Sequence, residues 1–422
     1  MAIYQTGELW FGNFTNRSFF LFDNKEKVST NEYLLTSLIV NLGDGKIVSR
    51  TGGIYSGDSR EIFDKAISKT VSSGEKEYGS SADWKSILSK RCVVYDYSFF
   101  LPYKDIEPLF GAKIKESEIE GKFDCIVLVP SNNGGDIETF FINRKTNTYV
   151  KYSAKENELS SRCYEDCLKL TPDNSFNYVS TKLNNFEVFS ENIFIPVWQR
   201  GDYTYHPVEE RPMLEDISDI ESNADLFFDN PVNKSSARNA DSFTFSSGNT
   251  VIKYEKNVFE LSDYDPIFEK DISFTENYKA AKNFLSKDEY IENEYYLSAY
   301  TDDGEGNFTF YFNYKLRSLL LLPSEELKDS TGIESFIEVG TYGGQIRKYK
   351  KYACGFDEIE SITKYALTDY ITATDKIAAE FLQGEAMRIN GIRLTLLAKK
   401  ERFEPVWSVN VNDKKYEVNV GE

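Results

Sequence analysis

The chain has 422 residues, of which 41% are hydrophobic, and its formal net charge is -19. It is too long for one hydrophobic core and long enough for two or three domains of ordinary size. Its 68 acidic side chains exceed its 49 basic ones, and this surplus repels both nucleic acid phosphates and anionic lipid headgroups. We therefore expect a soluble globular protein that binds no nucleic acid and does not adhere to a membrane by its own surface.

Residues 8–22, ELWFGNFTNRSFFLF, form an aromatic stretch near the start of the chain. Three interpretations compete: a membrane element, an exposed docking surface, or the first strand of a folded domain. Asn13, Asn16 and Arg17 interrupt the stretch, and no window reaches the roughly 18 uninterrupted apolar residues that a spanning helix needs. The first interpretation is therefore disfavoured, and we find no signal peptide.

The first third of the chain alternates strand and helix patterns. Residues 33–50 predict two strands around a Gly-Asp-Gly turn, and a helix follows with Asp58 or Ser59 as its N-cap. Residues 92–99 and 123–130 are continuous apolar runs, which are typical of strands covered on both faces. A hairpin ending near residue 153 and a helix over 155–170 complete this part.

The remainder is rich in hairpins. Gly248-Asn249 is expected to join two alternating strands, and Ser273 followed by Glu276 has the spacing of a capping box that begins a helix. Further predicted elements are strands at 294–301, 307–314, 334–341 and 345–353, a helix at 356–382, and strands at 392–398, 404–411 and 415–420.

These patterns predict an elongated α+β protein of mostly antiparallel sheets with packed helices. Short turns of Gly, Asn and Asp join antiparallel neighbours, whereas a doubly wound fold needs βαβ crossovers, which we do not find after residue 130. The expected organisation is three domains: an N-terminal α+β domain at 1–160, a central α+β domain at 161–265 and a C-terminal α+β domain at 266–422.

Residues capable of catalysis or metal binding are few. His206 is the only histidine and precedes a proline, so a surface or loop position is expected. Cys163 and Cys167 share one helix face, but a zinc site needs further Cys or His ligands that the chain does not supply. Cys92 and Cys125 could be neighbours, and whether they form a disulfide stays open. With Cys354 the chain has five cysteines, which are too few for a disulfide scaffold at this length, and their odd number leaves at least one unpaired unless it bonds between chains.

Three further motifs have ordinary structural explanations. Asp302, Asp303 and Glu305 lack the spacing of a calcium loop, so a hairpin turn is expected there. The glycine-rich segments match no nucleotide-binding pattern. The basic stretch RKYKKY, at 347–352, is interpreted as protection of an exposed edge strand. We therefore predict no catalytic, cofactor-binding or metal-binding residues and no cofactor.

Several segments, taken in order, resemble the YycH/YycI type of regulatory protein. They are YQTGELWF (4–11), YDYSFFLP (95–102), FDCIVLVP (123–130), ADLFFDNP (224–231), VIKYEKNVFEL (251–261), FIEVGTYGGQIRKYKKY (336–352) and FEPVWSVNVNDKKYEV (403–418). This family consists of membrane-anchored extracytoplasmic accessories of an essential sensor histidine kinase of low-GC Gram-positive bacteria. The resemblance covers most of the chain and implies a YycH/YycI-like fold.

The resemblance also implies a function and partners. It implies a non-enzymatic extracytoplasmic regulator that contacts a WalK-like sensor histidine kinase and a YycI-like accessory protein. The family's single N-terminal transmembrane helix is expected to precede the aromatic stretch and to have been removed before Met1. The alternative is a cell-surface solute- or carbohydrate-binding protein or hydrolase, with a deep cleft in which Trp84, Trp198 or Trp407 meets paired carboxylates.

Overall fold

The structure is a computed structural model. It describes residues 37–43, 46–49, 58–114, 120–132, 135–155, 158–169, 176–190, 192–197, 202–205, 208–214, 216–239, 242–265, 272–316, 319–358, 363–366, 368–380, 387–399, 402–412 and 414–419. The aromatic stretch at 8–22 and His206 lie outside the described residues. Within them, no helix is both long and apolar enough to cross a membrane.

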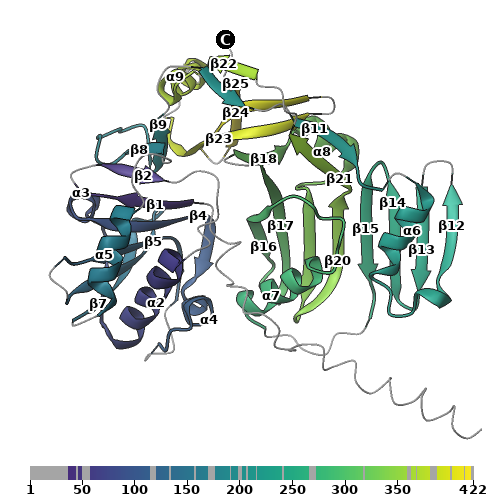
Figure 1. Ribbon diagram of the computed structural model, residues 1–422, viewed down its shortest axis with the longest axis horizontal. Helices are drawn as coiled ribbons and strands as arrows, with labels where there is room; N and C mark the ends of the chain where they lie inside the picture. Colours follow the sequence, from purple (N-terminus) through teal and green to yellow (C-terminus); the bar gives the residue numbers. More distant parts are fainter. Residues whose placement is uncertain are drawn as a thin grey trace, which may run out of the picture.

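A nine-stranded sheet forms the first lobe (Figure 1). The strand order is β3-β7-β6-β5-β4-β1-β2-β8-β9, and every neighbouring pair is antiparallel. The strands are β1 (Ser37–Asn41), β2 (Ile47–Ser49), β3 (Glu75–Gly79), β4 (Cys92–Pro102), β5 (Lys122–Pro130), β6 (Ile137–Asn143), β7 (Thr148–Ala154), β8 (Phe176–Ser180) and β9 (Phe194–Val197).

Helices cover both faces of this sheet, and β4 and β5 therefore bury side chains on both sides. Helices α2 (Asp58–Ser73), α4 (Ile106–Phe110) and α5 (Leu159–Lys169) share a core with Val93 and Tyr95 of β4. Helix α3 (Trp84–Ser89) clusters instead with Cys92 and Val94, which alternate with those residues and therefore point to the other face. The prediction of two doubly covered strands is confirmed.

A twelve-stranded sheet forms the rest of the molecule. Its order is β12-β13-β14-β15-β20-β19-β17-β18-β23-β24-β25, with β16 paired to β17, and only β18 and β23 pair in parallel among the described strands. The strands are β12 (Ser235–Asn239), β13 (Ser242–Ser247), β14 (Thr250–Glu255), β15 (Val258–Asp263), β16 (Tyr295–Asp302), β17 (Asn307–Leu316), β18 (Leu319–Pro323), β19 (Ile337–Tyr342), β20 (Gln345–Tyr352), β23 (Ile389–Lys399), β24 (Arg402–Val411) and β25 (Lys414–Asn419).

Smaller elements complete this second part. The helices are α6 (Ile217–Asp225), α7 (Phe274–Leu285), α8 (Glu325–Thr331) and α9 (Tyr370–Glu380), and two strand pairs join β10 (Asp202–Tyr205) to β22 (Thr363–Ala366) and β11 (Val208–Pro212) to β21 (Cys354–Glu358). The predicted helix at 356–382 is thus wrong in its first part. Residues there pair with distant strands, and only its second part is helical.

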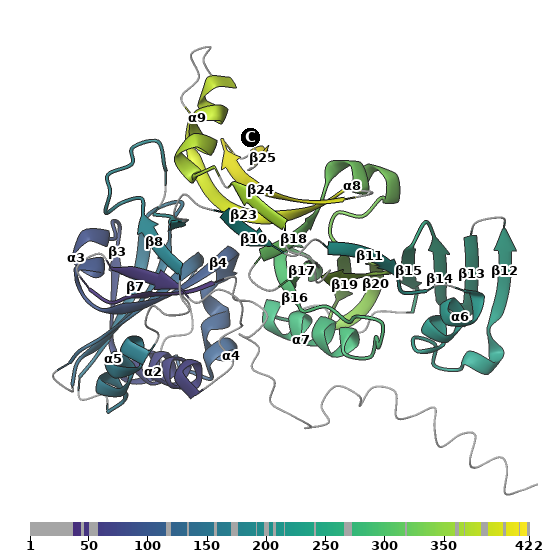
Figure 2. The ribbon, with the colours of Figure 1, turned by 45° about the horizontal axis from the view of Figure 1, so that its top comes forward.

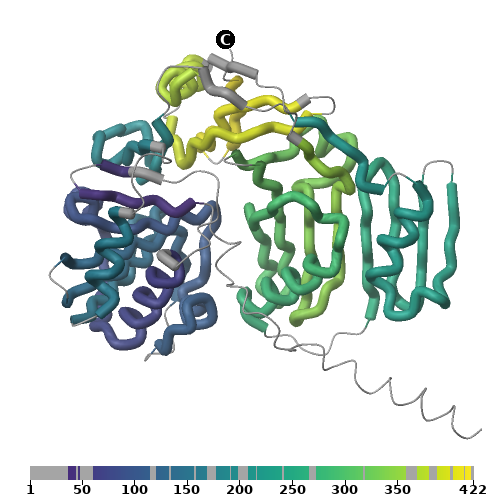
Figure 3. The backbone as a smooth tube through the Cα atoms, viewed as in Figure 1, coloured from purple at the N-terminus to yellow at the C-terminus, as the bar shows by residue number. Residues whose placement is uncertain are grey.

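The molecule has the shape of an arch (Figures 1 and 2). Strands β23, β24 and β25 span the top between the first lobe and the strands β16 to β20, as the tube in Figure 3 also shows. At the top, Phe189 forms a parallel bridge with Ile389. Lower down, the Tyr300 hydroxyl donates to the carbonyl of Phe100 at 2.9 Å. A single cluster of buried side chains continues from α2 to β24.

The predicted α+β class with mostly antiparallel sheets is confirmed. The predicted central segment, 161–265, divides between the two sheets: β8 and β9 join the first, whereas β12 to β15 join the second. The boundaries at 160 and 265 therefore do not coincide with the edges of the sheets. The division into three domains stays a prediction.

Candidate functional site

An open cleft of about 760 Å³ lies beneath the arch. The first lobe contributes residues 97–100 of β4, Asp124 of β5 and the β6–β7 turn, and the opposite wall comes from β16, β18, β23, β24 and β25. A cleft of this size falls in the range of small-molecule sites. It is the candidate site of the described part of the chain.

A break in the β4 ladder shapes the first wall. The register of β4 on β5 shifts between Asp96 and Leu101, so the intervening residues leave the regular pairing. Ser98 then donates to the carbonyl of Ser298 at 3.2 Å, and the ring of Phe99 meets that of Tyr300 edge-on with 5.8 Å between centroids. The bulge thus turns part of β4 from its own sheet toward the second part of the molecule.

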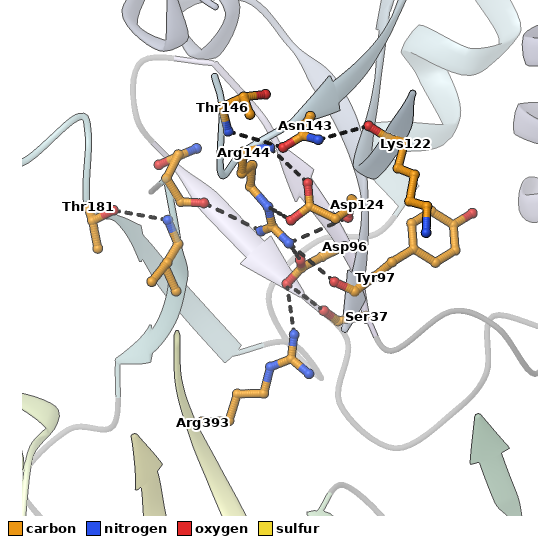
Figure 4. A network of polar contacts seen from close by, with 12 residues as sticks. Ser37, Asp96, Tyr97, Lys122, Asp124, Asn143, Arg144, Thr146, Thr181 and Arg393 are labelled. Carbon is orange, nitrogen blue, oxygen red and sulfur yellow. Dashed lines mark hydrogen bonds and ion pairs between the residues drawn. The ribbon is translucent and has the colours of Figure 1, made fainter. Parts of the chain in front are cut away.

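Arg144 anchors this wall from the end of β6 (Figure 4). Its Nε donates to Asp124 Oδ2 at 2.8 Å, and its Nη2 lies 2.7 Å from Asp96 Oδ1. Nη2 also donates to the carbonyl of Tyr97 at 3.2 Å, inside the bulge. Arg144 and both carboxylates are buried, so each charge depends on the others for compensation.

The charges around Arg144 keep it protonated. Burial lowers the pKa of Arg144, but the neighbouring Asp124 and Asp96 raise it further, and the net effect is a pKa above its ordinary value. Asp96 has a second cationic neighbour, because Arg393 Nη2 of β23 lies 3.9 Å from its Oδ2 (Figure 4). The network therefore extends from the first lobe to the strand that forms the arch.

A second buried ion pair lies away from the cleft. Lys351 of β20 donates to Asp288 Oδ2 at 2.6 Å, and Tyr349 donates to the same oxygen at 2.6 Å. Asn223 of α6 donates to Asp288 Oδ1 at 3.2 Å. Burial lowers the pKa of Lys351, although Asp288 opposes this shift. Its position between α6 and β20 indicates a structural role.

The cysteines are buried and free. Cys125 lies opposite Asp96 in the ladder, four residues along β4 from Cys92, so these two thiols are not cross-strand partners. Burial raises the pKa of Cys92 to about 12 and that of Cys163 to about 12. Thiols with such values are protonated near neutral pH and react poorly. Among the described residues, no group of His, Cys, Asp and Glu is placed to hold a metal ion.

The tryptophans considered as sugar-stacking platforms do not reach the cleft where they are described. Trp84 packs edge-on against Phe194 with 6.2 Å between centroids, and Trp407 is fully buried and donates to the carbonyl of Thr368 at 2.9 Å. Trp198 lies outside the described residues. The described part of the chain therefore lacks the predicted convergence of tryptophan with paired carboxylates.

Of two other sequence motifs, the structure confirms the prediction for one and contradicts it for the other. Asp302, Asp303 and Glu305 lie at the β16–β17 turn, where positive φ angles at Gly304 and Gly306 confirm the predicted hairpin. The basic stretch 347–352 was predicted to protect an edge, and this is wrong, because β20 lies between β15 and β19. The sequence analysis did not predict the cleft, because its residues come from seven strands and the segments between strands. Only the Gly, Asn and Arg content of 388–393 marks it locally.

Comparison with known proteins gives a likeness of fold. No family model and no curated protein matches this chain. The crystal structure of YycH from Bacillus subtilis superposes with a TM-score of 0.61 at 13% sequence identity, covering 94% of this chain and 98% of that one. An uncharacterized protein from Eubacterium rectale ATCC 33656 has a TM-score of 0.36 at 12% identity, covering 54% of this chain and 86% of its own, which is too weak to carry an argument. The chain therefore has a YycH-type fold.

Proposed function

We propose that this protein is a non-enzymatic extracytoplasmic regulator of a sensor histidine kinase in a two-component system. It acts by protein contact, with a WalK-like kinase and a YycI-like accessory protein as partners. The observation that carries the proposal is the YycH-type fold, which extends over 94% of this chain and 98% of the YycH chain. An alignment this complete includes both sheets and the arch, rather than one common substructure.

The site residues favour contact over catalysis. The thiols are buried, and burial raises the pKa of a thiol such as that of Cys92. The side chain of Arg144 already donates to Asp96, Asp124 and backbone carbonyls. The described tryptophans lie in hydrophobic cores, away from the cleft. The solute-binding alternative retains the cleft as its one supporting feature, whereas a hydrolase has no assembled nucleophile or acid pair among the described residues.

A regulator of this kind needs only a weak contact when both proteins are held at one membrane. Confinement raises the effective concentration of the partners, so a weak contact between the two extracytoplasmic domains suffices. The charge of -19 gives this chain no electrostatic reason to adhere to an anionic membrane by itself. We accordingly propose that a membrane anchor, in addition to this chain, supplies part of the kinase contact.

Calorimetry with the purified extracytoplasmic domain of a WalK-like kinase from the same organism tests the affinity. We expect weak binding near physiological salt, with a dissociation constant in the micromolar range or above, whereas a nanomolar value, about -12 kcal/mol, would show that no anchor is needed. To test the function itself, this chain and the full-length kinase are tethered to the same liposomes and autophosphorylation is measured. An unchanged rate, with or without the YycI-like protein, contradicts the proposal.

A further inference from the structure

The cleft beneath the arch differs in charge from the rest of the molecule. Its described lining contains five cationic side chains, Arg144, Lys145, Arg388, Arg393 and Lys415, but one carboxylate, that of Asp124. Over the whole chain the balance is reversed, with 49 basic and 68 acidic residues. A concave surface with the opposite sign to its surroundings concentrates ions of that opposite charge.

Two of these cations are available to a ligand. Lys145 and Arg388 are exposed, and neither forms an ion pair with a described residue. They come from opposite walls, because Lys145 lies in the β6–β7 turn of the first lobe and Arg388 directly precedes β23. A ligand between the walls can therefore be approached by positive charge from both sides.

The other cations are held in place to different degrees. Arg144 is fully engaged and shapes the wall rather than serving a ligand. Arg393 is 37% exposed and only 3.9 Å from Asp96, so its remaining donors can turn toward the cleft. Lys415 pairs with Glu417 at 3.0 Å on the surface, a contact that contributes little energy.

Neutral groups complete a binding surface. Ser298, Ser408 and Asn410 add hydroxyl and amide groups, while Phe100, Leu320 and Leu322 add apolar contact. Polar and charged side chains outnumber apolar ones in the described lining, which suits a charged ligand. Arginine in particular offers a planar pair of donors that matches carboxylate and phosphate oxygens.

We propose that this cleft binds a small anionic ligand that bears carboxylate or phosphate groups, held chiefly by Lys145 and Arg388 with Arg393 beside them. The proposal rests on the residues of the cleft and does not depend on the proposed regulation of a kinase. Because Arg393 also neighbours Asp96, the ligand competes for a cation that lies between the lobe and the arch.

Calorimetric titration of the complete chain with citrate and with pyrophosphate, at low ionic strength, tests the site. We expect at least one of the two to bind, with an affinity that falls as salt is added. The preference between them identifies carboxylate or phosphate as the recognised group. Maltotriose serves as an uncharged probe and is expected not to bind.

A pair of double variants locates the site. K145Q/R388Q is expected to weaken binding about tenfold or more, since each lost cation removes a charge-assisted hydrogen bond. K85Q/K279Q removes the same charge from exposed positions on α3 and α7 and is expected to bind as the unaltered chain does. Failure of both anions to bind, equal binding of maltotriose, or equal weakening in the two variants overturns the proposal.

Discussion

Arg144 connects three separate segments of the first lobe. Its Nε bonds to Asp124, its Nη2 to Asp96 and to the carbonyl of Tyr97, and its Nη1 to the carbonyl of Asn192 at 3.4 Å. Arg144 is only 7% exposed, so these contacts replace the hydrogen bonds to water that its guanidinium loses on folding. The β4 bulge depends on this side chain, since Arg144 satisfies a carbonyl within the irregular segment.

Replacing Arg144 with methionine tests that dependence. We expect the free energy of unfolding to fall by about 3 to 5 kcal/mol, because Asp124 would be left buried without a cation and Asp96 would keep only Arg393, at 3.9 Å. Urea unfolding at neutral pH measures the change. Arg162 is exposed on α5, and R162M should alter stability by less than about 0.5 kcal/mol. Equal effects of the two variants would contradict this account.

The buried thiols make stability sensitive to alkaline pH. The pKa of Cys163 is raised by burial to about 12 in the folded chain. An unfolded thiol titrates at about 8.5, so the unfolded chain releases its proton first as pH rises. The contribution is therefore complete below about pH 8.5 and is lost as pH rises toward the folded value. Buried tyrosines such as Tyr254, with a pKa raised to about 12, act in the same direction above pH 10.

Urea unfolding under reducing conditions at about pH 8 and pH 10.5 should show a clear loss of stability at the higher value. Lys351 acts in the opposite direction, because burial lowers its pKa, but it is one group against several buried thiols and tyrosines. In C163A the loss between the two pH values should be smaller, by about 1.4 kcal/mol for each pH unit in which the thiol would have titrated. A stability that is constant or higher at alkaline pH would refute the assignment.

At the scale of elements, the sequence predicted best those features whose interacting groups lie within a few residues of one another. The capping box of α7 is present as predicted: Glu276 N donates to Ser273 Oγ at 3.2 Å, and Ser273 N donates to Glu276 Oε2 at 3.0 Å. The hairpin around Gly248 formed because glycine at φ 60° suits its turn. Both signals involve atoms only a few residues apart.

The cap of α7 should be measurable in stability. Ser273 to alanine is expected to lower the free energy of unfolding by about 1 kcal/mol, within a range of about 0.5 to 2, since the N–H of Glu276 would lose its acceptor. Serine to aspartate should retain most of it, because a carboxylate caps equally well. K279A, on the exposed side of α7, is the matched control and should change stability little.

Elements whose identity depends on distant strands were predicted less well. The segment 356–382 carries apolar residues at helical spacing, yet Cys354–Glu358 pairs with β11 and Thr363–Ala366 with β10. Strand β20 carries three lysines among its eight residues, a content typical of an edge strand, yet it is flanked by β15 and β19. The buried Lys351 is compensated by Asp288, 63 residues away, which accepts a hydrogen bond from its Nζ. Such partners leave no mark in the local pattern.

At the scale of the whole molecule, the first lobe and the second sheet are coupled through a few side chains. Thr275 donates its hydroxyl to Asp105 Oδ1 at 2.7 Å, and Tyr300 contacts both Phe99 and Phe100. Because one buried cluster continues across these contacts, the two parts share a core. The cleft can keep its shape only while this contact holds.

Replacing Tyr300 with alanine should therefore destabilise the segment of β4 that Tyr300 contacts. The variant loses the ring packing with Phe99 and the hydrogen bond to Phe100, so we expect faster amide hydrogen exchange in the second half of β4, in the other lobe. Y264A, at a tyrosine that is 70% exposed, should leave that exchange unchanged. Faster exchange confined to β16 and β17 would show that the lobes are not coupled here.

The sequence by itself determined the α+β class, the antiparallel hairpins, the doubly buried strands β4 and β5, and the cap of α7. These features depend on side-chain periodicity and on turn and cap chemistry, which act over a few residues. The sequence also predicted a YycH/YycI-like fold, and the superposition on YycH confirms this fold.

Only the tertiary structure decided which strands are central, which charges are buried together, and where a cleft opens. Asp124 and Arg144 are 20 residues apart, and Arg393 reaches Asp96 from nearly 300 residues further along the chain. The strand order of a large sheet is set by which buried faces and backbone hydrogen bonds match across the whole molecule, so no local window contains it. The basic cleft exists for the same reason: its cations gather only when the arch closes over the first lobe.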